Sequence, residues 1–180
     1  PELDQRLKLL RSHGITRDKD LMHYQSDDEW YYEQIELGFN YRMTDIHAAL
    51  GLSQLTRLSE HVDKRYEIAE MYDQEFNDNN IQKPFRDCAN KSALHLYVVQ
   101  VEPAKHKRVF HALREKNIGV NLHYIPVHTH PYYQAMGFSW GDFPNSEAYY
   151  KKAISLPMFP TFSADEQRYV INTVKTLCNG

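Results

Sequence analysis

The chain has 180 residues, of which 42% are hydrophobic and 25% charged, and this composition is typical of a globular protein that buries a core. Its 21 Lys and Arg are scattered and are balanced by 24 Asp and Glu, so we expect no nucleic-acid partner. No apolar run reaches the roughly 18 to 20 residues that cross a bilayer, and no signal peptide opens the chain. We therefore expect no membrane partner and a cytoplasmic location. Cys88 and Cys178 lie far apart, which favours thiols over a disulfide framework or a zinc site.

The N-terminal segment predicts a helix followed by a long irregular loop. Residues 1–13 carry apolar side chains at helical spacing, and Gly14 suits the left-handed conformation that often ends a helix. Because the chain starts at Pro1 without an initiating Met, and the helical pattern is present from the first turn, we expect a piece of a longer protein. Residues 15–37 have no sustained period but contain an aromatic cluster at 30–32, which either docks against a ligand or partner or covers a local core.

The next stretch, residues 38–46, has the chemistry of a phosphate or carboxylate grip. Gly38 frees the backbone to turn, Asn40 has two amide hydrogens to donate, and Arg42 offers a planar fork of donors suited to an oxyanion. Thr44 is placed to cap a helix. The same residues also suit an ordinary loop and cap in which Arg42 pairs with a surface carboxylate, and spacing alone favours this simpler interpretation.

Residues 44–80 predict one long helix with a polar end. Apolar residues from Ile46 to Phe76 recur at spacings of three, four and seven, and no proline interrupts them. At 1.5 Å per residue such a helix is on the order of 50 Å long, which exceeds one small domain. It therefore either bends or connects two bodies, and the absence of proline favours a connector.

The remainder of the chain alternates strands and helices. We expect a strand over 93–101, a helix over 103–117, a strand over 120–123, a helix from 146, a strand over 154–157, and a last helix after the capping box at 163–166. This order predicts an α/β or α+β body with an open sheet covered by helices.

A segment rich in His and Pro lies within this body. His123, His128 and His130 fall within eight positions, and the last two would point to one side of an extended backbone. No carboxylate or Cys lies within residues 121–136 to complete a ligand set, so we expect no metal. His123 can accept or donate a hydrogen bond near neutral pH, which suits binding or catalysis. A structural histidine is equally compatible with the sequence.

Other reaction templates are missing from the sequence. It contains no Gly-rich phosphate loop, no nucleophile elbow, and no lysine with the buried, small-residue surroundings of a Schiff-base lysine. We therefore expect no catalytic residue within this chain.

Residues 38–55 resemble the G-x-N-x-R-x-x-x-I-x-A-A-x-x-x-x-Q-L signature of the DegT-type nucleotide-sugar aminotransferases. Three more runs follow that family's order: Arg11-Ser12-His13-Gly14, His123-Tyr124-Ile125-Pro126 and Ser155-Leu156-Pro157-Met158-Phe159-Pro160. Residues 30–33 and 131–133 are similar to the branch of the family that works in pseudaminic acid biosynthesis. His47 departs from the pattern, since the family usually has Gln there.

The resemblance implies an α/β fold class, specifically the C-terminal part of a fold-type-I transferase that depends on pyridoxal phosphate (PLP). Residues 1–43 would be the tail of the large domain with an interface loop. Residues 44–80 would be the connecting helix, and residues 81–180 the small C-terminal α/β domain.

The resemblance further implies a homodimer that moves an amino group from glutamate to a 4-keto-6-deoxy nucleotide sugar, in cell-surface polysaccharide or nonulosonic acid biosynthesis. Asn40 and Arg42 would lie near the PLP phosphate of the partner subunit. The nucleotide sugar would be faced by His123, Tyr124, Trp30 and Tyr31.

The family's Schiff-base lysine belongs to an N-terminal half that this chain does not include, so the chain alone should not transaminate. Two alternatives stay open. One is a dehydratase of the same family, which uses the same cofactor with His in place of that lysine. The other is a non-catalytic module for dimerisation or for binding a sugar nucleotide.

Overall fold

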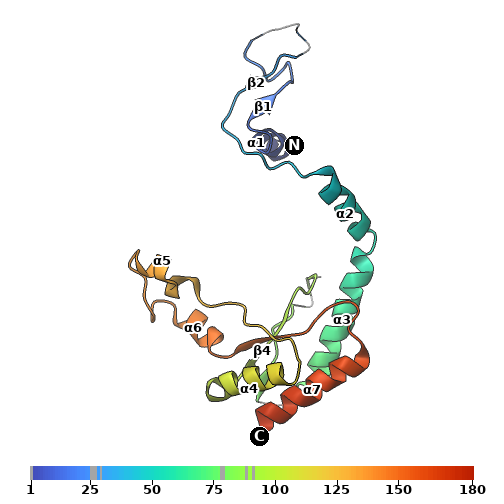
Figure 1. Ribbon diagram of the computed structural model, residues 1–180, viewed down its shortest axis with the longest axis vertical. Coiled ribbons are helices and arrows are strands. Elements are labelled where there is room, and N and C mark those ends of the chain that lie inside the picture. The colour runs from blue at the N-terminus through green and yellow to red at the C-terminus, as the bar shows by residue number, and fades with distance from the viewer. Residues whose placement is uncertain (1, 25–27, 29, 78–79, 88, 91) are drawn as a thin grey trace. The chain divides into compact units, whose positions relative to one another are not determined.

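The computed structural model describes residues 2–24, 28, 30–77, 80–87, 89–90 and 92–180 (Figure 1). The chain divides into two compact units, Pro1–Thr56 and Arg57–Gly180. Each unit has its own elements, and each is described by itself.

The first unit contains α1 (Glu2–Leu10), β1 (Ile15–Thr16), β2 (Glu33–Gln34) and α2 (Asp45–Leu55). After α1 the backbone N–H of Gly14 donates to the carbonyl of Leu9 at 3.0 Å, and Gly14 has a φ of +70°. A Cβ on Gly14 would lie 1.8 Å from the carbonyl oxygen of Glu36. The predicted helix is confirmed, but it ends at Leu10 and not at residue 13; Gly14 has the predicted left-handed conformation, and glycine is needed here for space as well.

Two segments of the first unit that are far apart in sequence lie side by side. Ser12 and Asn40 form an antiparallel bridge. On either side of it, the N–H of His13 donates to the carbonyl of Phe39 and the N–H of Tyr41 donates to the carbonyl of Arg11, each at 2.9 Å. The tertiary structure therefore joins the loop that contains Asn40 to the end of α1.

The region expected to form a single helix over 44–80 contains two helices, α2 and α3 (Leu58–Glu75). The hydroxyl of Thr56 donates to the carbonyl of Ser53 at 2.8 Å, and Arg57 leaves helical geometry with φ −105° and ψ 2°. The expectation of one unbroken helix is wrong. No Gly or Pro stands at the break, so no local helix breaker marked it. The three-part division of the whole protein stays a prediction.

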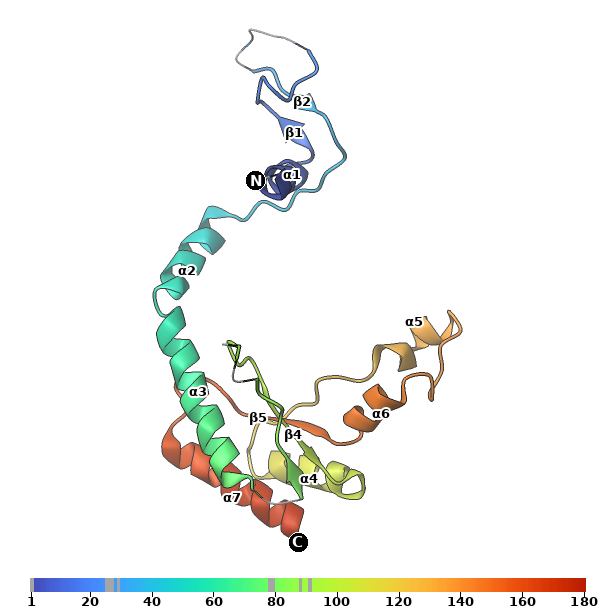
Figure 2. The same cartoon turned by 180° about the vertical axis from the view of Figure 1, so that it is seen from behind.

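The second unit is a three-stranded antiparallel sheet covered by helices (Figure 2). Its remaining elements are β3 (Ile81–Gln82), β4 (Tyr97–Val101), α4 (Pro103–Glu115), the 3₁₀ helix η1 (Val127–Thr129), α5 (Pro131–Gln134), α6 (Pro144–Tyr150), β5 (Ala153–Leu156) and α7 (Ala164–Asn179). The strand order is β3-β4-β5, with Tyr97 opposite Leu156. The expected alternation of strands and helices is confirmed from β4 onward, except at residues 120–123. There the expected strand is wrong, because the backbone makes only a single bridge, from Asn121 to Ser155.

One hydrophobic core holds the second unit together. Strand β4 buries every second residue, so one face of the sheet carries the core. That core receives Tyr72 from α3, Leu113 from α4 and Ile171 from α7, all almost fully buried. The predicted capping box starts α7, because Ser163 Oγ accepts from the N–H of Glu166 and Glu166 Oε2 accepts from the N–H of Ser163.

The structure bears on the cysteines and on the membrane-spanning segments only where the residues are described. Cys178 is buried in α7, and Cys88 lies outside the described residues. Within the described part of the chain, no helix is both long and apolar enough to cross a membrane.

Candidate functional site

Asn40 and Arg42, the two residues of the expected anion grip, contact each other. Arg42 Nε donates to Asn40 Oδ1 at 3.2 Å, and both side chains are exposed. Because the amide oxygen faces the guanidinium, the amide NH₂ of Asn40 points away from it and can donate elsewhere. The other guanidinium nitrogens of Arg42 are also donors. The pair thus offers several N–H groups to an anion from one short loop.

The predicted helix cap follows directly after this pair. Thr44 has the extended conformation of an N-cap residue, and its Oγ1 accepts from the N–H of His47 at 3.4 Å. His47 Nδ1 also lies 3.1 Å from the same oxygen. His47, which departs from the family signature, therefore contacts the cap and tightens the start of α2.

The aromatic residues expected at a ligand lie in the first unit as well. Trp30 is 73% exposed, whereas the hydroxyl of Tyr31 donates to Glu33 Oε1 at 3.0 Å. Glu33 also accepts from the backbone N–H groups of His23 and Tyr24, at 2.6 and 2.8 Å. Burial raises the pKa of Glu33, but the three donors have the larger combined effect, so its pKa is lowered. The hydrogen bond from Tyr31 to Glu33 raises the pKa of Tyr31. Glu33 thereby closes this loop, while Trp30 stays open to solvent.

Apolar side chains are exposed along the loop and along α2. The rings of Phe39 and Tyr41 stack with centroids 5.1 Å apart, and each is more than half exposed. The exposed set is Leu37, Phe39, Tyr41, Met43, Ile46, Leu50, Leu52 and Leu55. Clustered apolar exposure of this kind indicates an interaction surface.

In the second unit, His123 is held between two polar side chains. Its Nδ1 lies 2.7 Å from Ser155 Oγ in β5, and its Nε2 lies 3.5 Å from Asn121 Nδ2. The peptide bond between His123 and Tyr124 is cis. The two rings meet edge to face at 4.6 Å, and Tyr124 is 72% exposed. The structure thus brings His123 and Tyr124 together, with the tyrosine open to solvent.

His128 makes a buried contact within the second unit. Residues 127–129 form the 3₁₀ helix η1, so His128 does not lie on extended backbone, whereas His130, with φ −76° and ψ 145°, does. His128 Nε2 lies 2.9 Å from Glu147 Oε1, and both residues are buried. Among the described residues, no group of three or more His, Cys, Asp and Glu could hold a metal ion.

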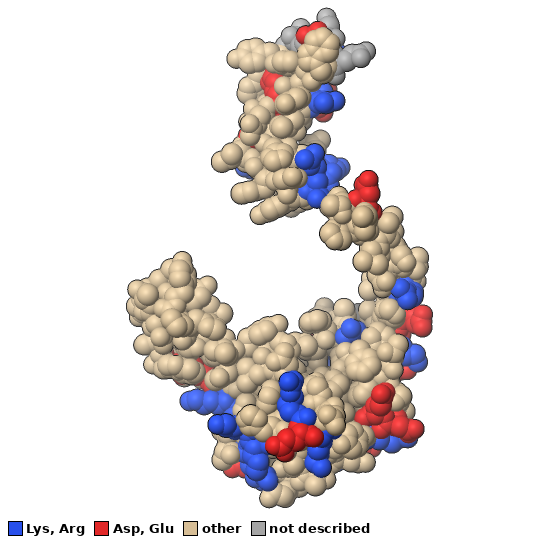
Figure 3. Space-filling view, viewed as in Figure 1, with Lys and Arg blue, Asp and Glu red and all other residues tan. Residues whose placement is uncertain are grey.

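Around this contact the chain forms an uncharged aromatic arm, defined here as residues 122–141. It projects from the sheet in both ribbon views, and in Figure 3 the surface around α5 shows no Lys, Arg, Asp or Glu. Its exposed apolar residues are Tyr124, Ile125, Val127, Tyr132, Tyr133, Met136, Phe138 and Trp140. Such a surface suits a flat, partly apolar ligand or another protein surface.

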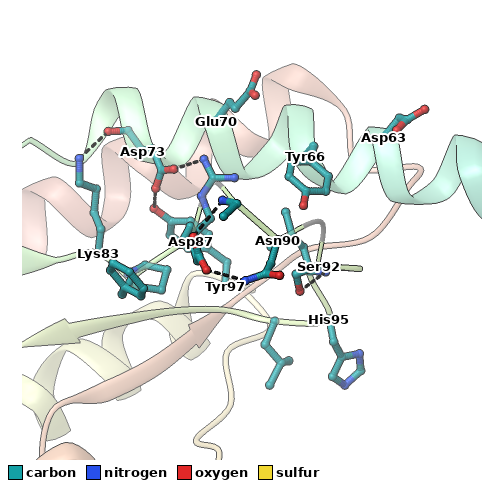
Figure 4. A pocket seen from close by; sticks show the side chains of 16 residues that line it. Asp63, Tyr66, Glu70, Asp73, Lys83, Asp87, Asn90, Ser92, His95 and Tyr97 are labelled. Atoms are coloured by element: carbon teal, nitrogen blue, oxygen red, sulfur yellow. Dashed lines mark hydrogen bonds and ion pairs between the residues drawn. The ribbon is translucent and has the colours of Figure 1, made fainter.

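A cavity of about 1040 Å³ lies between α3 and the segment that leads into β4 (Figure 4). Asp73 connects several residues that line the cavity. Its Oδ1 accepts from the hydroxyl of Tyr97 at 2.6 Å, and its backbone carbonyl accepts from Lys83 Nζ at 2.9 Å. Arg86 pairs with the other carboxylate oxygen. Burial, followed by the hydrogen bond to Asp73, raises the pKa of Tyr97. Nothing in the sequence predicted this cavity, because the space between α3 and the segment that follows it depends on how the two pack.

The comparisons with known proteins agree with this organisation. The sequence model of the DegT/DnrJ/EryC1/StrS aminotransferase family matches residues 1–175. The chain is 39% identical to the spore coat polysaccharide biosynthesis protein SpsC of Bacillus subtilis (strain 168), over 99% of the chain and 48% of SpsC. It is 32% identical to a UDP-4-amino-4,6-dideoxy-N-acetyl-beta-L-altrosamine transaminase of Campylobacter jejuni (serotype O:2), over 96% of the chain and 44% of the transaminase.

Solved structures of sugar aminotransferases also match the chain over part of their length. Spr1654 of Streptococcus pneumoniae, described as a sugar aminotransferase, has been solved in a form that carries pyridoxamine phosphate. It matches 99% of the chain and 43% of its own length, with a TM-score of 0.87 and 28% identity. A PLP form of the same protein matches with a TM-score of 0.86. The predicted fold class is confirmed, namely a mixed helix and strand structure that is one portion of an aminotransferase fold.

The chain spans slightly under half the length of the relatives named here, between 43% and 48%. The family model, by contrast, covers almost the whole chain. The chain therefore belongs to the DegT/DnrJ/EryC1/StrS aminotransferase family.

Proposed function

We propose that the full-length protein is a PLP-dependent aminotransferase that moves an amino group from glutamate to a 4-keto-6-deoxy nucleotide sugar. Family membership supports the reaction class, and the name of the C. jejuni relative describes a nucleotide sugar with an amino group at C4. The name of SpsC points to polysaccharide biosynthesis. We place the protein in the cytoplasm, in a pathway to a cell-surface polysaccharide or a nonulosonic acid such as pseudaminic acid.

The contact between Arg42 and Asn40 carries the proposal for cofactor binding. Arg42 Nε occupies the amide oxygen of Asn40, so the amide NH₂ is oriented to donate to an anion. The bridge from Ser12 to Asn40 holds the loop against α1, so the donors do not have to be ordered when the anion binds. A phosphate monoester suits these donors, and we assign Asn40 and Arg42 to the PLP phosphate of the partner subunit. PLP, when bound, supplies the electron sink that allows an amino group to be exchanged.

Four residues are proposed for the nucleotide sugar. His123 offers a ring nitrogen, and Tyr124 and Trp30 offer exposed aromatic faces on which a sugar or a base can stack. Tyr31 keeps its hydroxyl on Glu33, so it would contribute its ring edge. None of these groups supplies the proton transfer of the reaction, which requires the lysine expected outside this chain.

A second copy of the protein is the proposed partner of the exposed apolar surface on the loop and α2. Phe39 and Tyr41 flank Asn40 in sequence. A second copy that covers their rings would therefore also bring the cofactor bound to that second copy close to Asn40. Burial of these side chains would stabilise the association by roughly 25 cal/mol per Å² of apolar surface.

The test is a product analysis of the full-length protein. The protein is incubated with PLP, glutamate labelled with ¹⁵N at its amino group, and a UDP-4-keto-6-deoxy sugar. Transfer of ¹⁵N to C4 of the sugar supports the proposal. Loss of a sugar hydroxyl without ¹⁵N incorporation identifies a dehydratase, and an unchanged sugar that still binds identifies a non-catalytic binding module.

A further inference from the structure

His123 is contacted at both ring nitrogens by side chains that were not assigned to any ligand. Ser155 Oγ lies 2.7 Å from Nδ1 and Asn121 Nδ2 lies 3.5 Å from Nε2. Ser155 is only 4% exposed, which leaves its hydroxyl inside the protein next to the ring. These contacts determine which nitrogen of the neutral imidazole carries the hydrogen.

The orientation of the Asn121 amide is set by the backbone. Its Oδ1 accepts from the N–H of Leu122 at 2.8 Å, so the NH₂ end is the one that faces His123. An amide NH₂ only donates hydrogen bonds. Nε2 of His123 must therefore present its lone pair to Asn121, and the hydrogen of the neutral ring lies on Nδ1, which donates to Ser155 Oγ.

The sheet holds both partners in place. The N–H of Ser155 donates to the carbonyl of Asn121 at 2.8 Å, and the N–H of Asn121 donates to the carbonyl of Ser155 at 3.3 Å. On its other side Ser155 pairs with Val98 of β4. The backbone of Ser155 is bonded on both sides, which fixes its Cα next to the ring, and its burial encloses the hydroxyl there.

We propose that Ser155 and Asn121 are positioning residues that select the Nδ1–H tautomer of His123, so that Nε2 acts as a hydrogen-bond acceptor for the substrate. The contact of Nε2 with Asn121 is at the long limit of a hydrogen bond, so a substrate donor can take its place. An acceptor nitrogen selects a sugar hydroxyl or a base N–H and disfavours a phosphate oxygen. This inference rests on the proposed function for the identity of the substrate.

The first test reads the tautomer directly in the full-length protein. With ¹⁵N-labelled histidine, the ring signals of His123 are assigned by their loss in His123→Gln. At a pH where the ring is neutral, Nδ1 should show the shift of a protonated nitrogen and Nε2 that of an unprotonated one. Ser155→Ala removes the acceptor of the Nδ1–H hydrogen and should raise the share of the Nε2–H tautomer, which the NH₂ of Asn121 still opposes. An Nε2–H tautomer in the unmodified protein, or an unchanged tautomer in both Ser155→Ala and Asn121→Asp, would overturn the inference.

Asn121→Asp provides a second variant that leaves the buried position untouched, because Asn121 is exposed. It places an acceptor opposite Nε2 and should draw a hydrogen to that nitrogen. Ser146→Ala, which removes an exposed hydroxyl from α6, is the matched control and should leave the His123 signals unchanged.

Kinetics complete the test. Ser155→Ala should raise KM for the nucleotide sugar on the order of 2- to 10-fold, the loss of one neutral hydrogen bond, with kcat and KM for glutamate nearly unchanged. A changed tautomer with an unchanged KM for the sugar would overturn the assignment of Nε2 to the substrate. A changed tautomer in a protein without transferase activity would instead reject the proposed function and leave the positioning of His123 supported.

Discussion

Glu147 Oε1 lies 2.9 Å from His128 Nε2 in a buried contact that ties η1 to α6. The N–H of Gly141 donates to the same oxygen at 2.7 Å. The ring of His128 also packs against Phe143, with centroids 4.8 Å apart. One carboxylate therefore holds η1, within the uncharged aromatic arm, and Gly141 at the arm's end, and the shape of the arm depends on it.

This carboxylate should make the stability of the chain depend on acid. The N–H of Gly141 and then His128 lower the pKa of Glu147 below its ordinary value of 4.5. A lowered pKa in the folded state means that the ionised group contributes stability above pH 4.5, and that this contribution is lost as the pH falls through the folded-state pKa. We therefore expect Glu147→Gln to be less stable than the unmodified chain in urea unfolding at neutral pH, with the difference shrinking as the pH falls below 4.5.

The control for Glu147→Gln is Glu115→Gln, which changes an exposed carboxylate at the end of α4. It should show a small difference at every pH. If the stability difference between Glu147→Gln and the unmodified chain stayed constant across the pH range, the charge of Glu147 would contribute nothing to stability.

Asn40→Ala in the full-length protein should weaken PLP binding. Loss of one hydrogen bond to a charged phosphate costs on the order of 1 to 3 kcal/mol, or roughly 5- to 150-fold in Kd. The measurement is a PLP titration followed by absorbance. Asn172→Ala removes an exposed amide from α7 and should bind PLP normally. Equal Kd values for the two variants would remove Asn40 from the phosphate site.

His123→Ala should separate the two substrates in steady-state kinetics. Because His123 is assigned to the nucleotide sugar, KM for the sugar should rise on the order of 10-fold, while KM for glutamate should change far less. The measurement is the rate of amino transfer with each substrate varied in turn. An equal rise in both constants would speak against a contact with the sugar.

Tyr72→Phe should destabilise the second unit. The hydroxyl of this buried tyrosine donates to the carbonyl of Pro157 at 2.9 Å, and burial raises its pKa, so it stays protonated. Its removal leaves a partly buried carbonyl without that donor, which costs about 1 to 3 kcal/mol of stability in urea unfolding. Tyr169→Phe is the matched control, since its hydroxyl donates to the carbonyl of Lys116 at an exposed site where water can replace it. Equal losses in the two variants would show that burial is not the cause.

Gly14→Ala should disrupt the first unit and, through the bridge from Ser12 to Asn40, the proposed phosphate grip. The added Cβ would meet the carbonyl oxygen of Glu36 at 1.8 Å, and the φ of +70° is strained for alanine. We expect the free energy of unfolding to fall by more than about 1 kcal/mol. The measurement is urea unfolding monitored by Trp30 fluorescence in a Trp140→Phe background, because Trp30 and Trp140 are the two tryptophans of the chain.

Gly51→Ala gives the control for this change. Gly51 lies within α2, nothing is within 4 Å of its added Cβ, and Ala favours a helix over Gly by about 0.5 to 1 kcal/mol. It should therefore be neutral or stabilising. A similar loss of stability in both variants would contradict a steric role for Gly14.

Features that depend on neighbouring residues were predicted well. The capping box at Ser163 and Glu166, the cap at Thr44 and the glycine end of α1 each use atoms only a few residues apart, so their residue types suffice. The break between α2 and α3 was missed because Thr56 and Arg57 fit a helix as well as a turn, and the local signal was ambiguous.

The sequence by itself determined the family and the order of most elements, because both lie in local motifs. Only the tertiary structure decided that Ser155 orients His123 from 32 residues away and that Glu147 meets His128 across 19 residues. The physical reason is that a polar group must find a partner when it is buried, but the partner is supplied by whichever segment the packing of the core brings next to it.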